Sequence, residues 1–371
     1  MMKVKTRIIP IFVPHYGCPH DCYFCNQKSI TGHQDILTID TIQQQLESRF
    51  QMNRLQTPMV MTEIAFFGGS FTAIPVDDQE KLLSLAHQLL QKGDVDTIRI
   101  STRPDAIDER NLQLLKDKGV GIIELGVQSM DNQVLRLMNR GHTAEDTIKA
   151  SKLIKNFGFK LGHQIMPGLY GSSLSKDLST MQASIDLKPN MVRIYPTLVI
   201  KNTKLENLYH SGDYKPLELN ESIRLVAYFY TQYWLNQIEV IKMGLQASDT
   251  IAVEGDVVAG PFHPAYGQMV KTHIMLTVLL DRLMSQDVKS WTIIGSKKII
   301  NEVVGVKKKG AQMLKSQLNL DQLIYQAEEN IDGIIIKDIY NHHIHLTQND
   351  LIHEYEKITR ENINGFKRNY Y

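Results

Sequence analysis

Residues Gly17 to Asn26 read GCPHDCYFCN, and this stretch contains all three cysteines of the 371-residue chain. Three thiols within a few residues can hold a metal centre together. A disulfide framework is excluded, because the cysteine count is odd and we see no signal-peptide pattern at the N-terminus. Clustered cysteines in a reducing compartment are typical of metal or redox chemistry. The stretch therefore predicts a metal site carried by one loop.

Two kinds of metal site fit these residues. A structural zinc site needs four ligands in tetrahedral geometry, usually from two pairs far apart in the sequence. A second cysteine pair is missing, but a fourth ligand could come from one of three nearby histidines, His15, His20 and His33. The spacing also suits a 4Fe-4S cluster in which Cys18, Cys22 and Cys25 each bind one iron and the fourth iron stays open. The residues alone are compatible with both a zinc site and a 4Fe-4S cluster.

Composition places the chain among ordinary globular proteins. It is 43% hydrophobic and 22% charged, with a formal net charge of +1. The near-neutral charge argues against a protein that wraps nucleic acid by bulk electrostatics, although a local basic patch remains compatible with it. No apolar run reaches the roughly 18 residues of a membrane helix. We expect a cytoplasmic protein with no membrane partner.

The first 217 residues alternate between strand and helix patterns. Strands are predicted at 6–13, 63–67, 97–101, 121–127, 159–166 and 191–195. Helices are predicted from Thr38 onward and at 77–91, 107–118, 131–139, 144–156 and 174–187. This alternation favours parallel βαβ units, with functional residues at the carboxyl ends of the strands. We therefore expect an α/β fold in which 1–217 form a barrel-like sheet.

The remaining chain has weaker patterns. We expect 218–290 to be a helical extension with a substrate-side loop, and 291–371 to be a small α+β lobe of short apolar runs separated by polar turns. The loop before the helix at 269–284 contains His263 and Tyr266. Because exposed histidine and tyrosine next to a barrel mouth often contact ligands, these two residues are candidate substrate contacts.

Several strand ends carry polar residues suited to a small ligand. Gly68, Gly69 and Ser70 follow the second strand, where glycines permit close backbone approach. Glu124 lies inside an apolar strand, so its carboxylate must be paired or perturbed. Gln128 can both donate and accept hydrogen bonds, and the downstream Arg140 could clamp a carboxylate.

The cysteine spacing, with the aromatic Phe24 before the last cysteine, resembles the signature of the radical S-adenosylmethionine (radical SAM) superfamily. The resemblance implies a partial (β/α)6 TIM-like barrel. It also implies that SAM chelates the open iron of a 4Fe-4S cluster. An electron from a low-potential donor such as flavodoxin or ferredoxin would then cleave SAM to a 5'-deoxyadenosyl radical.

The same resemblance implies roles for individual residues. Phe24 would lie beside the adenine, and Gly68 and Gly69 resemble a Gly-Gly-Glu element that binds the SAM amino group, with Ser70 in place of the glutamate. Together, the residues expected to bind SAM are Phe24, Gly68, Gly69, Ser70, Thr102, Glu124, Gln128, Arg140 and Gln164. The expected metal ligands are Cys18, Cys22 and Cys25.

Five motifs within about residues 6–217 resemble the radical SAM half of the Elongator catalytic subunit. They are Thr102 to Asp105, Glu124 to Ser129, Asn139 to Thr143, Ile165 to Leu169, and Tyr195 to Thr197 with Tyr214 to Pro216. This branch implies a tRNA nucleoside as substrate. Two features depart from it: the cysteine spacing is shorter, and no Gly-rich acetyl-CoA loop follows Leu217. Two alternatives are a small-molecule or tetrapyrrole enzyme related to oxygen-independent coproporphyrinogen oxidase, and a non-catalytic zinc-stabilised binding protein.

Overall fold

The computed structural model describes residues 5–13, 17–26, 44, 60–247, 251–252 and 255–366. The helix expected from Thr38 onward, apart from Gln44, lies outside the described residues, as do His15 and His33. The chain forms two compact units, Met1–Pro216 with Leu245–Gly260, and Leu217–Gly244 with Pro261–Tyr371. Among the described helices, none is both long and apolar enough to cross a membrane.

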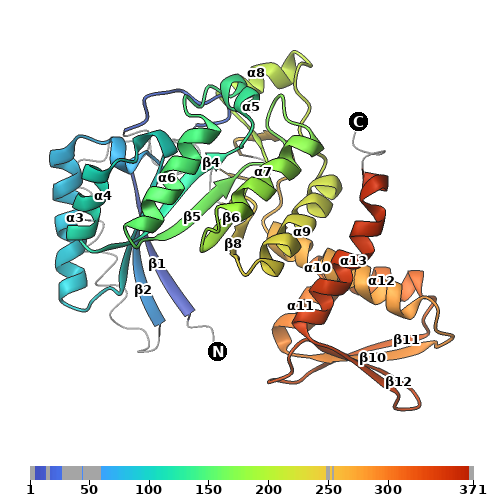
Figure 1. The fold of residues 1–371 in the computed structure, drawn as a ribbon. Helices are drawn as coiled ribbons and strands as arrows, with labels where there is room; N and C mark the ends of the chain where they lie inside the picture. Colours follow the sequence, from blue (N-terminus) through green and yellow to red (C-terminus); the bar gives the residue numbers. More distant parts are fainter. Residues whose placement is uncertain are drawn as a thin grey trace. The chain divides into compact units, whose positions relative to one another are not determined.

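Parallel strands form the sheet of the first unit, and they lie side by side in chain order (Figure 1). The strands are β1 (Lys5–Phe12), β2 (Val60–Phe67), β3 (Thr97–Thr102), β4 (Val120–Gln128), β5 (Lys160–Ile165) and β6 (Met191–Ile194). The helices between them are α3 (Val76–Gln91), α4 (Glu109–Asp117), α5 (Asn132–Leu137), α6 (Ala144–Asn156) and α7 (Leu174–Asp186). This arrangement confirms the predicted partial (β/α)6 barrel, because the consecutive parallel strands from β2 to β6 are joined by helical crossovers. After β6 the unit adds β7 (Val199–Ile200), which pairs with β9 (Val257–Ala259), and α8 (Lys204–His210).

Side-chain caps fix where the helices of the first unit begin. The carboxylate of Asp108 accepts a hydrogen bond from the backbone N–H of Asn111 at the start of α4. Thr143 forms a capping box with Asp146 at the start of α6. Each cap satisfies a backbone donor that the first helical turn leaves without a partner. The loops from strand to helix therefore have defined ends, which positions the residues they carry.

A layer of four charges, three buried and one on the half-buried Arg193, crosses the interior of the barrel. Arg99 of β3 forms ion pairs with Glu63 of β2, Nε to Oε1 at 2.6 Å, and with Glu124 of β4. Glu124 also accepts from Arg193 Nε of β6 at 2.8 Å. Gly162 of β5 leaves room for this contact, because a Cβ there would lie 2.8 Å from Cγ of Glu124. The two carboxylates balance the two guanidiniums, so the layer is neutral where isolated charges would be costly.

The opposite face of β5 is also polar and fully satisfied. His163 is 1% exposed, and its two ring nitrogens lie 3.0 Å from Ser151 Oγ of α6 and 2.9 Å from Ser184 Oγ of α7. Burial lowers the pKa of His163 to about 3, so the ring is neutral. Through these two contacts, His163 connects helices α6 and α7 to the sheet.

The second unit contains long helices and a separate sheet. It comprises α9 (Leu219–Leu235), β8 (Glu239–Met243), α10 (Tyr266–Leu283), β10 (Ser290–Gly295), α11 (Lys297–Val304), α12 (Lys309–Gln317), β11 (Gln322–Ala327), β12 (Ile334–Asp338), β13 (His343–Leu346) and α13 (Gln348–Phe366). The sheet has the order β11-β10-β12-β13, with β10 parallel to β11 and the other pairs antiparallel. Helices α11, α12 and α13 lie on one side of it (Figure 1). The predicted α+β lobe is confirmed.

The sequence reading missed individual helices of this lobe. The apolar run at 299–304 lies in α11, and no helix was predicted where α13 lies. A signal for α13 was present, since Thr347 Oγ1 caps the N–H of Asp350 and the carboxylate of Asp350 accepts in return. Leu351, Ile352 and Tyr355 then bury one helical face.

Replacing Glu63 by glutamine tests the charge layer. The change leaves Arg99 with one carboxylate fewer in a buried site, so we expect the free energy of unfolding to fall by about 3 kcal/mol. Urea denaturation measures this loss. Glu80→Gln on α3 is the matched control, because Glu80 is exposed and its replacement should leave the urea midpoint unchanged. An equal midpoint for both variants would contradict a stabilising role for the layer.

Candidate functional site

The cysteine loop follows β1 and is fixed at several backbone positions. The backbone N–H of Tyr23 donates to the carbonyl of Met138 at 3.1 Å, and the carbonyl of Tyr23 accepts from the N–H of Leu205 at 2.8 Å. The side-chain amide of Asn139 donates to the carbonyl of Asp21 at 3.0 Å. The loop is therefore held both by the segment after α5 and by the start of α8.

The start of the cysteine loop packs tightly against the turn after β2. Gly17 has a φ of 73°, and a Cβ on it would clash with the carbonyl oxygen of Ser70 and lie 2.8 Å from the backbone nitrogen of Ile74. Only glycine fits such an approach without strain. The structure thus brings the predicted Gly68, Gly69 and Ser70 turn directly beside the loop that carries the thiols.

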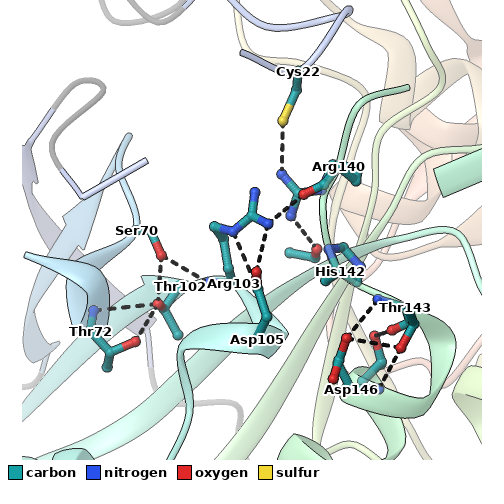
Figure 2. A network of polar contacts seen from close by, with 12 residues as sticks. Cys22, Ser70, Thr72, Thr102, Arg103, Asp105, Arg140, His142, Thr143 and Asp146 are labelled. Carbon is teal, nitrogen blue, oxygen red and sulfur yellow. Dashed lines mark hydrogen bonds and ion pairs between the residues drawn. The ribbon is translucent and has the colours of Figure 1, made fainter. Parts of the chain in front are cut away.

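Hydroxyl groups join the ends of β2 and β3. Thr102 Oγ1 lies 3.0 Å from Ser70 Oγ and 2.6 Å from Thr72 Oγ1, and all three side chains are buried (Figure 2). Ser70 Oγ also accepts from the backbone N–H of Arg103 at 3.3 Å. Ser70 and Thr102, which the sequence selected separately, therefore lie in direct contact.

Arg140 links the cysteine loop to β4. Its Nη1 donates to Sγ of Cys22 at 3.4 Å, and its Nη2 donates to the carbonyl of Gly126 at 2.8 Å (Figure 2). The side chain is 7% exposed, and among the described residues its buried Nε has no hydrogen-bond partner. A buried guanidinium with a spare donor beside a thiol is suited to an anionic ligand.

Gln128 lies next to this guanidinium. A Cβ on Gly126 would lie 3.1 Å from Gln128 Nε2 and 3.2 Å from Arg140 Nη2, so the glycine forms a small cradle between them. Gln128 has a φ of 64°, a left-handed conformation that glutamine seldom adopts. Its Oε1 accepts from Nε2 of Gln164 at 3.3 Å. Two predicted residues, on β4 and β5, are thereby brought together beside Arg140.

A second arginine supports the first. Arg103 donates from two nitrogens to the carboxylate of Asp105, at 2.9 and 2.8 Å, and also donates to the carbonyl oxygen of Arg140 (Figure 2). Burial would raise the pKa of Asp105, but the hydrogen bonds from Arg103 outweigh this effect and hold the pKa below its usual range. Burial, together with the charge of Arg140, lowers the pKa of the neighbouring His142 to about 3, so this ring stays neutral.

Phe24 is buried in an apolar cluster beneath the cysteine loop. Cys22, Leu169 and Tyr214 belong to the same cluster, and Phe24 itself is 8% exposed. Phe24 thus packs under the cysteine loop, and its contact with adenine stays a prediction. Glu124 is already engaged by Arg99 and Arg193, as expected for a buried carboxylate, and its contact with SAM also stays a prediction.

The loop after β5 reaches this cluster and is held by a buried carboxyl group. Asp177 of α7 accepts from the N–H of Gly168 at 2.9 Å and from the hydroxyl of Ser172 at 2.6 Å. The hydroxyl of Tyr214 donates to the carbonyl of Gly168 at 2.7 Å. Burial raises the pKa of Asp177 to about 7. Its protonation state is therefore coupled to the loop that packs beside Cys22.

The two candidate substrate contacts lie in the second unit. Tyr266, a candidate in the loop before the predicted helix at 269–284, is 2% exposed and begins α10. Its hydroxyl is 2.6 Å from Ser222 Oγ, and a Cβ on Gly244 would lie 2.9 Å from its ring. His263 is partly exposed and accepts from the N–H of Ala265 at 3.0 Å. A substrate contact by either residue stays a prediction.

The residues of the first unit fit a thiolate-bound cluster with a small anionic ligand. All three thiols are free, and Cys22 is buried while Cys18 and Cys25 are partly buried. Within the described ranges, which include His20, no three His, Cys, Asp or Glu side chains are already grouped to hold a metal ion. The unpartnered Nε of Arg140 and the cradle at Gly126, which is lined by donor groups of Gln128 and Arg140, lie beside Cys22 and could receive the carboxylate of a small ligand.

Charged residues inside strands were the main omission of the sequence reading. Glu63, Arg99 and Arg193 were not selected, although each stands in an apolar strand where a charge needs a partner. That rule identified Glu124 and would have identified the other three. Arg103 and Asp105 belong to the motif Thr102 to Asp105, and the structure pairs their side chains and joins Arg103 to the carbonyl oxygen of Arg140.

Comparisons with known proteins agree with this geometry. The sequence profile of the radical SAM superfamily matches residues 12–182, and that of the radical SAM C-terminal domain matches residues 189–275. An uncharacterised protein of Methanocaldococcus jannaschii, MJ0486, is 34% identical over 238 residues, which cover 61% of this chain and 72% of that protein. The chain belongs to the radical SAM superfamily of enzymes.

Within the superfamily, the chain is similar to the Elongator branch. The tRNA uridine(34) acetyltransferase of M. jannaschii is 29% identical over 260 residues, covering 60% of this chain and 48% of the relative. The solved structure of Elp3 from Methanocaldococcus infernus has a TM-score of 0.58 and 24% identity, covering 75% of this chain and 64% of that one, and shows the same fold. The chain spans about half the length of the acetyltransferase relative.

A pH titration of stability tests the loop anchor. The folded pKa of Asp177, about 7, lies above its ordinary value of 3.8, so the folded state keeps a proton that the unfolded chain releases. Stability should therefore be highest below pH 4 for this group and fall as the pH rises through 7, by up to about 4 kcal/mol. Asp177→Asn should remove this slope in urea unfolding at pH 5 to 8. The exposed Asp186→Asn is the control, and a slope that survives in Asp177→Asn would refute the assignment.

Proposed function

We propose that this protein binds a 4Fe-4S cluster through Cys18, Cys22 and Cys25 and cleaves SAM reductively, with a tRNA nucleoside as its substrate. The observation that carries this proposal is the contact of Arg140 with Cys22, with a spare buried donor on the same guanidinium. A zinc site would need only ligands, whereas this arrangement adds a place for an anionic group next to the thiols. Gln128 and the turn at Gly68 would line the remaining sides of this anion site.

The cluster and SAM supply the difficult chemistry when bound: one electron from a low-potential donor such as flavodoxin or ferredoxin breaks a carbon–sulfur bond and leaves methionine and a 5'-deoxyadenosyl radical. The protein supplies binding, orientation and exclusion of water. Arg140 would pair with the methionyl carboxylate, and the backbone at Gly68 and Gly69 would accept from the amino group. Phe24 and the buried cluster around it would keep solvent from the thiol loop.

RNA as the substrate rests on the relatives. The M. jannaschii relative carries the name of an enzyme that acts on uridine 34 of tRNA, and it matches this chain over 260 residues. The matched part includes the radical SAM region but covers only 48% of that relative, so the acetyl transfer in its name has no support here. We infer a tRNA nucleoside as the group from which the radical removes a hydrogen atom.

Anaerobic reconstitution with iron and sulfide tests the cofactor assignment. We expect a brown protein with a broad visible band that converts SAM to 5'-deoxyadenosine when dithionite is added. Cys22→Ala should abolish both signals, because one iron loses its only protein ligand. Ser151→Ala is the control, since Ser151 of α6 contacts His163 on the face of β5 that points away from the thiols, and it should keep both. A colourless protein with stoichiometric zinc would overturn the proposal in favour of a zinc-stabilised protein.

Titration of the reconstituted enzyme with tRNA tests the substrate class. Unmodified tRNA should increase the rate of 5'-deoxyadenosine formation, since substrate hydrogen quenches the radical. If tRNA neither binds at moderate salt nor changes this rate, the RNA assignment fails while SAM cleavage stands. A tetrapyrrole or other small molecule that raises the rate instead would identify the alternative class.

A further inference from the structure

The second unit carries a group of lysines that the radical SAM site does not use. Residues 296–318 contain six lysines and one acidic residue, Glu302, which is buried and paired with Lys271 at 3.1 Å. Residues 319–366 contain nine acidic and three basic residues. Positive charge is thus concentrated in α11, α12 and the turn between them, in a chain whose net charge is only +1. The six lysines are Lys297, Lys298, Lys307, Lys308, Lys309 and Lys315.

Three of these lysines occupy the turn between α11 and α12, here called the lysine turn, Gly305 to Gly310. Lys307, Lys308 and Lys309 are all exposed, and in the described part of the chain none of them forms an ion pair or hydrogen bond through its ammonium group. The first turn of α12 contains no acidic residue. The field of the helix start therefore adds to that of the ammonium groups.

The lysine turn is rigidly placed. Gly310 has no room for a side chain, because a Cβ there would clash with the carbonyl of Val303 and lie 3.0 Å from the carbonyl of Val304. A Cβ on Gly305 would lie 3.0 Å from Cγ2 of Thr272, whose hydroxyl donates to the carbonyl of Glu302 at 2.6 Å. The turn is packed onto α10, so its exposed side chains project from a fixed backbone.

Lysine is an unusual choice for two of these positions. Lys307 and Lys308 have φ values of 51° and 61°, in the left-handed region where glycine or asparagine is the less strained residue. At five other such positions the chain uses asparagine, namely 139, 202, 319, 330 and 341, whereas Lys188 is a single left-handed lysine among the described residues. Two consecutive left-handed lysines therefore retain charge where a relaxed backbone would favour another residue. That choice is explained if the ammonium groups bind a partner.

We propose that the lysine turn binds the phosphate backbone of RNA and thereby holds the substrate RNA to this enzyme. Adjacent lysines on a rigid turn match the repeating negative charge of a nucleic-acid strand. The GXXG loop of KH modules clamps about four nucleotides of RNA backbone in a comparable way. Here the turn between two helices has glycines at 305 and 310, with a wider spacing than in GXXG, and Met313, 41% exposed one turn further along α12, offers an apolar contact for a base. The choice of RNA over another polyanion rests on the proposed function.

Fluorescence anisotropy with labelled, unmodified tRNA tests this surface in the full-length reconstituted protein. The triple variant Lys307→Gln, Lys308→Gln, Lys309→Gln should raise Kd on the order of 10- to 100-fold at 150 mM KCl. The slope of log Kd against log salt should decrease by about 2 to 3. The control triple, Lys149→Gln, Lys152→Gln, Lys160→Gln, removes the same charge from exposed sites of the first unit and should change Kd by about twofold or less.

Wild-type affinity in the lysine-turn triple, or an equal loss in the control triple, would overturn the proposal. An acidic polyglutamate peptide that competes as well as tRNA at equal charge would overturn it in favour of a protein partner. Lys308→Gly separates binding from backbone strain, because glycine relaxes the left-handed position. We expect weaker tRNA binding by several-fold with an unchanged or higher Tm. A lower Tm with unchanged Kd would show that the lysine serves the fold and would refute the proposal.

Turnover distinguishes this proposal from the proposed function. Formation of 5'-deoxyadenosine without RNA should be equal in the wild type and the lysine-turn triple, because the turn is not among the residues expected to bind SAM. If tRNA binds through the lysine turn but never alters SAM cleavage, the proposed binding surface is supported and the proposal of a tRNA nucleoside as substrate is refuted. If tRNA stimulates SAM cleavage equally in the wild type and the lysine-turn triple, the proposed binding surface is refuted and the proposal of a tRNA substrate is supported.

Discussion

The guanidinium of Arg140 is the interaction on which the site depends. It donates to Cys22 in the loop after β1 and to the carbonyl of Gly126 in β4, so two segments more than a hundred residues apart share one side chain. Its own backbone carbonyl is held by Arg103, which is in turn paired with Asp105. Such a chain of charge-assisted hydrogen bonds orients a positive group in a buried place without a carboxylate of its own. A ligand carboxylate would complete that arrangement.

Two groups of largely buried polar residues hold the segments around Arg140 and Cys22 in position. The neutral layer of Glu63, Arg99, Glu124 and Arg193 joins β2, β3, β4 and β6 across the barrel interior. Beside the thiol loop, Asp177 holds the turn at Gly168 through a carboxyl group that burial keeps protonated up to about pH 7. Strand ends that are fixed in this way allow a loop rich in glycine and cysteine to keep one geometry. The polar layers thus serve the position of the site as well as the stability of the fold.

Much of the fold could be predicted from the sequence because its signals are local. Strand and helix periods, and glycines at helix ends, identified the parallel sheet, and the cysteine spacing marked the thiol loop. Pairing across the barrel could not be predicted, because which partner Arg99 meets depends on strand register and on the missing side chain at Gly162. Tyr266 was misplaced because an N-terminal helical residue and a loop residue look alike without a cap, and Ala265 supplies no side-chain cap. In α13 a capping signal existed at Thr347 and was overlooked.

The central claim is that three thiols hold a cluster whose fourth iron is free to bind SAM. Mössbauer spectroscopy of the protein reconstituted with iron-57 tests it most directly, with spectra recorded before and after SAM is added. Three cysteine ligands predict one iron that is distinct from the other three and whose signal alone shifts when SAM binds. Arg140→Gln should weaken that shift at limiting SAM and leave the cluster in place. Four equivalent irons that SAM leaves unchanged, or a protein that takes up zinc and no iron, would contradict the claim.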